Sequence, residues 1–482
     1  LDLKWVSVNL GRNRADGEEQ TPLDSCGCPV DLVCNHDRSP MDRPWRKKPP
    51  PHPPATTPAA RALLPWVPVA LPLSLCALLF FFLAHLHLNR QPPLFPLHRP
   101  TPQQRQTHQL STPPRPPRGC DFSRGRWVRG RRPLRYDGRC PFHRNAWNCL
   151  RNGREGMDAI NSWVWVPEGC GNGTAAAAAP PPGVGIDPAA FLGAMRGRRI
   201  GFVGDSLNEN FVVSFLCILR SADGRARKWK RKGAWKGGYF PQFDVTVAYH
   251  RAVLLARYEW RPTEESASRS KDEVKGIYRV DVDIPADDWA NVTNFYDVLI
   301  FNTGHWWGAD KFPEQTPLVF YREGKPIIPP LGILDGLKVV LENMVSYIER
   351  EVPRDTLKFW RTQSPRHFYG GEWNQNGSCL FQEPIEEGQL DIWFDPRNRG
   401  VNKEAREVNN LIQHALVGTD IQVLNITYLS EFRADAHPAV WLGKKDAVAI
   451  WGQDCLHWCL PGVPDTWADI LATQILQNLG KG

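Results

Sequence analysis

Most of this chain lacks an excess of charge of either sign, although its formal net charge of +8 over 482 residues suggests a basic protein. Residues 1–118 carry +6 of this charge, and residues 119–482 carry only +2. A surface that binds nucleic acid needs clustered Lys and Arg to neutralise phosphates. The near-neutral body of the chain therefore argues against nucleic acid as a partner.

Charged residues are completely absent from Ala62–Asn89. The apolar core of this segment, Val69–Leu88, matches the roughly 20 residues that a helix needs to span the hydrocarbon of a bilayer. A buried helix of a soluble protein would show a polar face, which this segment lacks. A cleaved signal peptide is the alternative, but the apolar run exceeds a typical signal core and no clear cleavage site follows it. The sequence therefore predicts a transmembrane anchor over residues 62–89.

Basic residues precede the predicted anchor, and few charges follow it. Because positive charge favours the cytosolic side, we expect a cytosolic N-terminus and a lumenal body, as in a single-pass type II protein. Methionine is scarce, with 4 residues, and the first is Met41. We interpret residues 1–40 as a gene-model extension or a disordered segment, and residues 41–61 as a basic, proline-rich cytosolic tail. The basic residues before the anchor are Arg43, Arg46, Lys47, Lys48 and Arg61.

Acidic residues are missing from residues 91–118, which are rich in Pro and Gln. This composition favours an extended, semi-rigid stem, to which we assign residues 90–118. A second low-complexity patch, Ala175–Pro182, indicates a surface loop. We expect this loop to separate a cysteine-rich N-terminal module at 119–185 from a main domain at 186–482.

The cysteines and glycosylation sequons indicate a secretory compartment. Eight of the 12 cysteines follow the predicted anchor, and an even number on the lumenal side predicts disulfide bonds. Eight cysteines allow 105 pairings, so the sequence leaves the connectivity open. Four sequons predict a glycoprotein. The eight cysteines are Cys120, Cys140, Cys149, Cys170, Cys217, Cys379, Cys455 and Cys459, and the sequons begin at Asn172, Asn291, Asn376 and Asn425.

Short apolar runs alternate with helix-like segments from Arg199 onward. The runs resemble buried strands, and the helix-like segments place apolar residues at helical spacing. This alternation predicts an α/β fold with a largely parallel sheet flanked by helices. The expected strands are 200–203, 297–301, 357–360 and 421–424, and the expected helices are 207–220, 334–350 and 402–417.

Ser206 stands where the first expected strand gives way to a helix, in the sequence Gly204-Asp205-Ser206. Folds of this class place their sites at the carboxyl ends of strands. A helix N-terminus there offers N–H groups to a developing oxyanion. We therefore predict Ser206 as a nucleophile, with Gly204 as a contact for the oxyanion or the substrate. The alternative is that Asp205 or Ser206 merely caps the helix.

Asp454 and His457 supply the two other groups that a catalytic serine needs. The histidine would act as the base and the carboxylate would orient it. Their spacing of three residues lets both face the same serine from one turn. Asn302 follows the second expected strand, and its amide could donate to the oxyanion. It could instead be a turn residue beside Gly304.

A metal site at His457 is another alternative, because Cys455 and Cys459 flank this histidine. Zinc would need a fourth ligand with matching geometry, and lumenal cysteines are more often bridged. We therefore expect no metal.

Three further histidines, His305, His367 and His437, are expected to be structural or to contact substrate rather than to catalyse. Among the 20 tryptophans, Trp306 and Trp307 follow Asn302 closely enough for one of them to line the cleft. Aromatic faces stack well on sugar rings, so these residues favour a glycan acceptor.

A series of motifs occurs in a fixed order over residues 119–479. The motifs include Cys120-Asp121-Phe122, Gly204-Asp205-Ser206-Leu207-Asn208, Asn302-Thr303-Gly304-His305-Trp306-Trp307, Gly370-Gly371-Glu372-Trp373-Asn374 and Asp454-Cys455-Leu456-His457-Trp458-Cys459. In these motifs the chain resembles the plant trichome birefringence-like family, whose members include wall-polysaccharide O-acetyltransferases. So many motifs in one order make coincidence implausible. One departure is Glu209, which stands where a basic residue often follows Leu-Asn.

The resemblance implies an SGNH/GDSL-esterase-like catalytic domain at 186–482, a small disulfide-bearing N-terminal module and a Golgi membrane anchor at 62–89. It also implies a triad of Ser206, His457 and Asp454 that forms an acyl-enzyme. The implied activity is acetyl transfer to hydroxyls of a cell-wall polysaccharide, xylan first, in the Golgi lumen. No bound cofactor is expected; the acetyl donor, acetyl-CoA or an acetylated intermediate, is a co-substrate.

Two alternatives to the transferase stay open at this stage. A polysaccharide acetyl esterase would use the same three residues with water as the acceptor. A non-catalytic wall-polysaccharide-binding protein would use none of them chemically.

Overall fold

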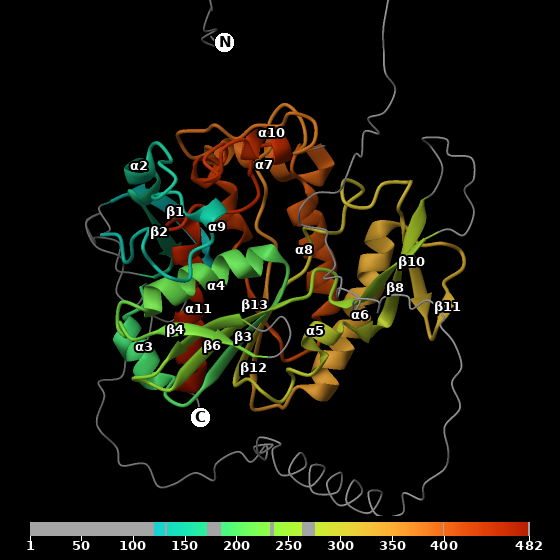
Figure 1. Cartoon of the computed structure of the whole chain (residues 1–482), viewed down its shortest axis with the longest axis horizontal. Helices are drawn as coiled ribbons and strands as arrows, with labels where there is room; N and C mark the ends of the chain where they lie inside the picture. The colour runs from blue at the N-terminus through green and yellow to red at the C-terminus, as the bar shows by residue number, and fades with distance from the viewer. Residues whose placement is uncertain are drawn as a thin grey trace, which may run out of the picture. The chain divides into compact units, whose positions relative to one another are not determined.

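A seven-stranded sheet organises the part of the chain that the computed structural model describes, residues 120–130, 133–170, 185–231, 236–262, 275–398 and 400–480 (Figure 1). The first five strands in spatial order are parallel, and each of the last two is antiparallel to the strand before it. The predicted α/β fold with a largely parallel sheet is therefore confirmed. The order is β13 (Gln422–Leu424), β12 (Leu357–Arg361), β9 (Val298–Phe301), β3 (Arg199–Gly204), β6 (Val245–Arg251), β5 (Lys236–Phe240) and β4 (Arg227–Lys230).

Both faces of the central strands are covered by helices, which explains why these strands are apolar throughout. Phe202 and Ile300 lie in one core with residues of α4 (Ser206–Leu219) and α11 (Val463–Leu479). Val203 and Phe301 lie in a second core with residues of α6 (Ile333–Glu351) and α8 (Glu404–Ala415). Each strand and helix expected from the sequence is present, with ends that differ by at most two residues.

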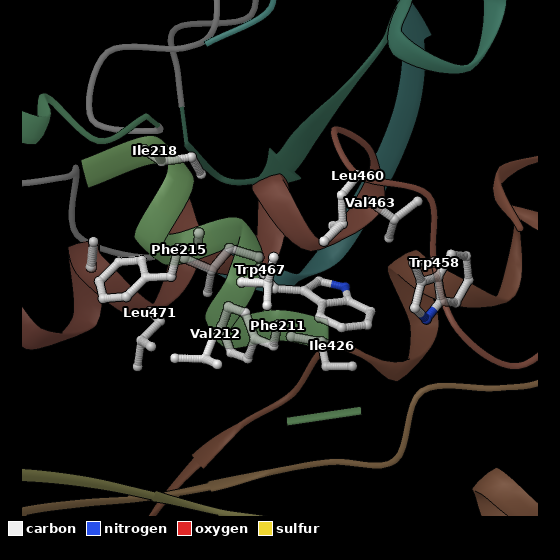
Figure 2. Packing of buried hydrophobic residues seen from close by; sticks show 14 of the residues in the cluster. Phe211, Val212, Phe215, Ile218, Ile426, Trp458, Leu460, Val463, Trp467 and Leu471 are labelled. Atoms are coloured by element: carbon white, nitrogen blue, oxygen red, sulfur yellow. The ribbon is translucent and has the colours of Figure 1, made fainter. Parts of the chain in front are cut away.

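Helix α4 is buried along its whole length. Figure 2 shows its apolar side chains packed against α11, with the indole of Trp467 beside Phe211. The two ring centroids lie 5.6 Å apart in an edge-to-face arrangement, a favourable geometry for aromatic pairs. A helix enclosed in this way holds its N-terminal residue, Ser206, in a fixed place.

Two smaller sheets complete the described structure, and the sequence patterns did not reveal them. A two-stranded sheet pairs β1 (Asp121–Arg129) with β2 (Trp163–Glu168), and a four-stranded sheet packs against α6. The four strands are β11 (Lys325–Pro326), β10 (Leu318–Arg322), β8 (Gly276–Pro285) and β7 (Ala256–Pro262). The remaining helices are η1 (Asn145–Trp147), α2 (Met157–Asn161), α3 (Pro188–Ala194), α5 (Asp287–Ala290), η2 (Glu387–Gln389), α7 (Leu390–Phe394), η3 (Pro396–Asn398), α9 (Thr427–Glu431), η4 (Ala434–Ala436) and α10 (Ala447–Trp451).

All eight cysteines that follow the predicted anchor form disulfides, as expected. One disulfide closes the N-terminal module, two join this module to the main domain, and one joins two loops within the main domain. In this order the pairs are Cys120–Cys170, Cys140–Cys217, Cys149–Cys459 and Cys379–Cys455.

The predicted anchor at 62–89 lies outside the described residues, as do residues 1–61, the stem at 90–118 and the loop at 175–182. None of the helices that the structure does describe is both long and apolar enough to cross a bilayer.

Candidate active site

Ser206, His457 and Asp454 come together in the folded chain, although Ser206 and His457 are 251 residues apart in sequence. The Oγ of Ser206 donates a hydrogen bond to Nε2 of His457 over 2.8 Å. On the other side of the ring, Nδ1 donates to the carboxylate of Asp454, 3.0 Å from Oδ2 and 3.2 Å from Oδ1. This is the order of contacts that a serine nucleophile, its base and an orienting carboxylate require.

The end of β3 and the start of α4 position Ser206. Asp205 is the N-cap of α4, and its Oδ1 accepts the N–H of Leu207 over 3.0 Å. Of Asp205 and Ser206, which the sequence offered as alternative helix caps, Asp205 is the one that caps α4. Ser206 is the first residue of the helix, so its N–H has no partner inside the helix and lies at the positive end of the helix dipole.

Gly204 allows the ends of β3 and β9 to approach each other closely. Its φ is +148°, and a Cβ at this position would lie 2.0 Å from Oδ1 of Asn302. The structure thus gives Gly204 a packing role. Its predicted role as a contact for the oxyanion or the substrate stays a prediction.

Asn302 is fully buried beside Asp205. Its Nδ2 donates to Oδ1 of Asp205 over 2.8 Å, and its Oδ1 lies 3.3 Å from the donating N–H of Asp205. One of the two N–H bonds of the amide is therefore used by Asp205. Donation to an oxyanion would rely on the other, so that role also stays a prediction.

Asp454 is held in its ionised form. Burial by itself would raise the pKa of Asp454, but the neighbouring His457 and the N–H groups of His457 and Leu456 lower this pKa to about 2. Oδ1 accepts those two N–H groups over 2.9 and 3.2 Å. A carboxylate that is charged at every physiological pH can stabilise the imidazolium that forms when His457 takes a proton.

Backbone contacts on both sides fix the loop that carries His457. Asn210 of α4 accepts the N–H of Trp458 over 3.0 Å and donates to its carbonyl over 3.1 Å. His437 donates from Nδ1 to the carbonyl of His457 over 2.7 Å. On the other side of the His437 ring, Nε2 lies 2.7 Å from Nδ1 of His367. Both histidines are fully buried, so the structure places them in supporting positions.

The two cysteines that flank His457 are both in disulfides, Cys455 with Cys379 and Cys459 with Cys149. Neither thiol is available as a metal ligand. Within the described residues, no group of three or more His, Cys, Asp or Glu side chains is arranged to hold a metal ion.

His305 and Arg361 contribute buried polar atoms next to Asp205. Burial lowers the pKa of His305 to about 3 against the opposing charge of Asp205, so this ring is neutral. Burial also lowers the pKa of Arg361, to about 10. Nε2 of His305, Nη2 of Arg361 and Oδ2 of Asp205 have no hydrogen-bond partner in the described part of the chain. Unsatisfied buried polar atoms are rare. We therefore expect these three atoms to form hydrogen bonds with a substrate or with ordered water.

The two tryptophans after Asn302 differ in position. Trp307 is buried and donates from Nε1 to the hydroxyl of Thr303 over 2.9 Å. Trp306 is partly exposed, and the guanidinium of Arg251 lies 5.4 Å from the centre of its ring. Of these two tryptophans, Trp306 is therefore the one whose exposed ring surface a ligand can contact.

Glu209, which stands where the family resemblance predicts a basic residue, is well accommodated. It lies in the first turn of α4 and pairs with Arg144 and with Lys236, the latter at 2.8 Å. Burial alone would raise the pKa of Glu209, and these two cations lower it instead. Its negative charge also suits the positive end of the helix.

The sequence patterns did not identify Trp147, whose ring stacks on the imidazole of His457. The ring centroids are 4.8 Å apart and the planes are inclined by 28°. Trp147 lies in η1 of the N-terminal module, and its carbonyl accepts the N–H of Leu460 over 2.9 Å. The sequence signal for this contact is that Trp147 lies two residues before Cys149. This signal places Trp147 near His457 only when the pairing of Cys149 with Cys459 is known.

We predict that Trp147→Leu lowers the rate of catalysis. An aromatic face stabilises a cation above it, so its removal disfavours the imidazolium that forms when His457 takes a proton. The value of kcat should then fall by about tenfold. Hydrolysis of an activated acetyl ester measures this rate. Trp147→Phe keeps an aromatic face and should keep kcat. An unchanged kcat for Trp147→Leu would mean that the ring only fills space.

Comparison with known proteins identifies two family domains in this chain. Residues 185–474 match PC-Esterase, a GDSL/SGNH-like acyl-esterase family found in Pmr5 and Cas1p, and residues 118–171 match the PMR5 N terminal domain. The match at 185–474 confirms the expected esterase-like fold.

Three proteins of Arabidopsis thaliana illustrate the similarity. Protein trichome birefringence-like 12 is 66% identical over 376 residues, which cover 77% of this chain and 88% of that protein. Protein trichome birefringence-like 13 is 41% identical over 384 residues, covering 77% and 89%. Protein trichome birefringence is 30% identical over 381 residues, covering 76% and 57%. With two matching domains in sequence and relatives this similar over most of their length, the chain belongs to the trichome birefringence-like family of GDSL/SGNH-like acyl esterases.

Proposed function

We propose that this protein is an O-acetyltransferase that moves acetyl groups to hydroxyls of a plant cell-wall polysaccharide. The observation that carries the proposal is the hydrogen-bonded series from Ser206 through His457 to Asp454. Acyl transfer in two steps through a serine ester is the chemistry that such a series supports.

In the first step, Oγ of Ser206 attacks the carbonyl carbon of the acetyl donor. The Ser206 proton passes to Nε2 of His457 as the Oγ–C bond forms. The bond from carbon to the donor's leaving group then breaks, and the leaving group takes the proton from His457. Asp454 holds Nδ1 and stabilises the transient imidazolium. The product of this step is acetyl-Ser206.

In the second step, a sugar hydroxyl takes the place of the leaving group. Its proton passes to Nε2 of His457 while its oxygen bonds to the acetyl carbon. The bond from carbon to Oγ of Ser206 breaks, and the serine recovers its proton from His457. In both steps the tetrahedral oxyanion would be held by the N–H of Ser206, with Asn302 as the second donor.

The acceptor and the compartment are further parts of the proposal. Resemblance to wall-polysaccharide acetyltransferases favours a wall glycan, with xylan first, and Trp306 offers an aromatic surface to it. Four disulfides among the described residues suit an oxidising compartment. We therefore propose a Golgi-lumenal protein, anchored through residues 62–89, that uses acetyl-CoA or an acetylated intermediate as donor.

Product analysis separates the proposal from its rivals. The protein is incubated with an acetyl donor and xylan oligosaccharides, and the oligosaccharides are analysed by mass spectrometry. Gain of acetyl groups that depends on Ser206 supports transfer. Release of acetate without gain indicates an esterase. No turnover with any donor, together with glycan binding that is unchanged in Ser206→Ala, indicates a binding protein.

A further inference from the structure

A cleft of about 550 Å³ opens at the carboxyl edge of the sheet, and none of the triad residues lines it. Its size lies within the range of small-ligand sites. Three segments form its walls: α8 with the preceding η3, the chain after β12, and the chain after β13 that leads into α9. The lining residues that matter here are Thr362, Asn409, Asn410, Gln413, Asn425 and Tyr428.

The charged side chains in the cleft neutralise one another. Arg397 pairs with Asp395 at 2.6 Å and Arg406 pairs with Glu431 at 2.8 Å. Hydrogen bonds from Arg397 lower the pKa of Asp395 to about 2, so this acid stays ionised and paired. With two cations and two anions engaged, the cleft has no net charge to attract a phosphate or an amine. Its ligand should be neutral.

The uncharged lining is rich in amides and hydroxyls. Asn409 forms a rigid part of the wall, because it accepts the N–H of Gln363 and donates to the hydroxyl of Thr427. Asn410 and Gln413 are exposed and lie three residues apart, on one side of α8. Each amide can donate and accept hydrogen bonds. The ring of Tyr428 adds an apolar surface. A neutral ligand with many hydroxyl groups, such as a short stretch of glycan, matches this lining.

The cleft also lies on the same edge of the sheet as Ser206. Thr362 follows β12 and Ser206 follows β3, with β9 between these strands. Neighbouring strands are about 4.8 Å apart, so the two strand ends are separated by about 10 Å. Arg361 is buried in the interval, where its Nε donates to Asn208 in the first turn of α4 over 2.9 Å. A polymer that reaches both the cleft and the nucleophile would therefore pass over this buried contact.

We propose that this cleft is a distal subsite for the polysaccharide acceptor, binding sugar residues away from the one that is acetylated. The proposal rests on the proposed function for its substrate class. It requires binding to depend on acceptor length, because only a long oligosaccharide reaches both the cleft and Ser206.

An N-glycan attached to Asn425 would also place sugar in this cleft. It lines the cleft and begins the sequon Asn425-Ile426-Thr427. In the structure its Oδ1 accepts a hydrogen bond from the hydroxyl of Thr362 over 3.3 Å. An N-glycan on Asn425 would fill the cleft with the chain's own carbohydrate, so the test must distinguish a bound acceptor from an attached glycan.

The test compares Asn410→Ala/Gln413→Ala with Gln382→Ala, an exposed glutamine outside the cleft. All three substitutions are made in full-length protein that carries Ser206→Ala, so that binding is measured without turnover. The probes are xylobiose and long oligosaccharides of xylan, mannan and xyloglucan, titrated by calorimetry. We expect the double variant to bind its long oligosaccharide about tenfold more weakly, as for the loss of two hydrogen bonds. Xylobiose binding and the Gln382→Ala control should not change.

Several results would overturn the subsite. They are equal affinity of the double variant and the control, equal weakening for short and long probes, and no binding of any long probe. A glycan found on Asn425 by mass spectrometry of the native protein would also overturn it. A different result would reject the proposed function but keep the cleft as a glycan site. This result is length-dependent binding to the Ser206→Ala protein, together with no acetyl transfer by the protein that retains Ser206.

Discussion

Ser206→Ala is expected to lower the rate of acetyl transfer by about 10⁴-fold or more, as for loss of the nucleophile in other serine enzymes. Without Oγ there is no acyl-enzyme, and the hydrogen bond of 2.8 Å to His457 has no donor. The side chain is small and sits at the start of an enclosed helix, so the fold should persist. Single-turnover assays with acetyl donor, combined with mass spectrometry of the intact protein, measure the rate and detect acetyl-Ser206.

Asp454→Asn provides an independent check on the same prediction. An amide keeps the size of the carboxylate but favours the wrong tautomer of His457, and a loss of about 10⁴-fold in kcat is expected. Asp335→Asn, an exposed acid in the first turn of α6, is the matched control and should be inert. If Ser206→Ala transfers acetyl groups at the normal rate, the triad is not the catalyst. If Ser206→Ala is inactive but Asp454→Asn keeps its activity, a group other than Asp454 orients His457.

Removal of the Cys149–Cys459 disulfide, as Cys149→Ala/Cys459→Ala, is expected to have the second largest effect. The bond joins residues separated by 310 positions, and a cross-link over so long a loop contributes about 3–5 kcal/mol to the free energy of unfolding. It also anchors the segments that bring Trp147 onto His457. The variant should therefore lose both stability and kcat. Denaturant unfolding and acetyl-transfer assays below the unfolding transition measure the two effects separately.

The Cys120–Cys170 disulfide offers the matched control. It lies within the N-terminal module and spans 50 residues. Its removal should reduce stability but leave kcat unchanged in the folded protein. Equal kcat values for the two double variants would show that the bond at Cys459 does not position the base.

The parts of the fold and site that the sequence predicted are those with a local pattern. The strands at 200–203 and 297–301 are apolar because both sheet faces are covered, and this burial is visible in the residues themselves. Ser206 was predicted as a nucleophile because strand and helix signals meet at one point. Asp454 and His457 lie in one turn, but such a spacing is common, and the family motifs made this pair a credible prediction. The contact between Ser206 and His457 joins residues 251 positions apart and has no local signal.

The parts that the sequence did not predict depend on distant partners. The stacking of Trp147 on His457 follows from a disulfide whose pairing is one of many that eight cysteines allow. In the four-stranded sheet of β7, β8, β10 and β11, β7 has mostly exposed polar and aromatic residues, so this strand lacks a clear apolar run. The use of the Asn302 amide by Asp205 depends on the close approach of two strand ends at Gly204.

The Cys149–Cys459 bond also has a consequence for the biosynthesis of the protein. Cys149 is synthesised 310 residues before Cys459, so this native pair can form only after nearly all of the described domain has been made. A nascent chain that stops before residue 454 contains Ser206 but lacks the two residues that are proposed to activate it. In the proposed mechanism, the order of synthesis therefore keeps the active site incomplete until the segment that carries His457 has been made.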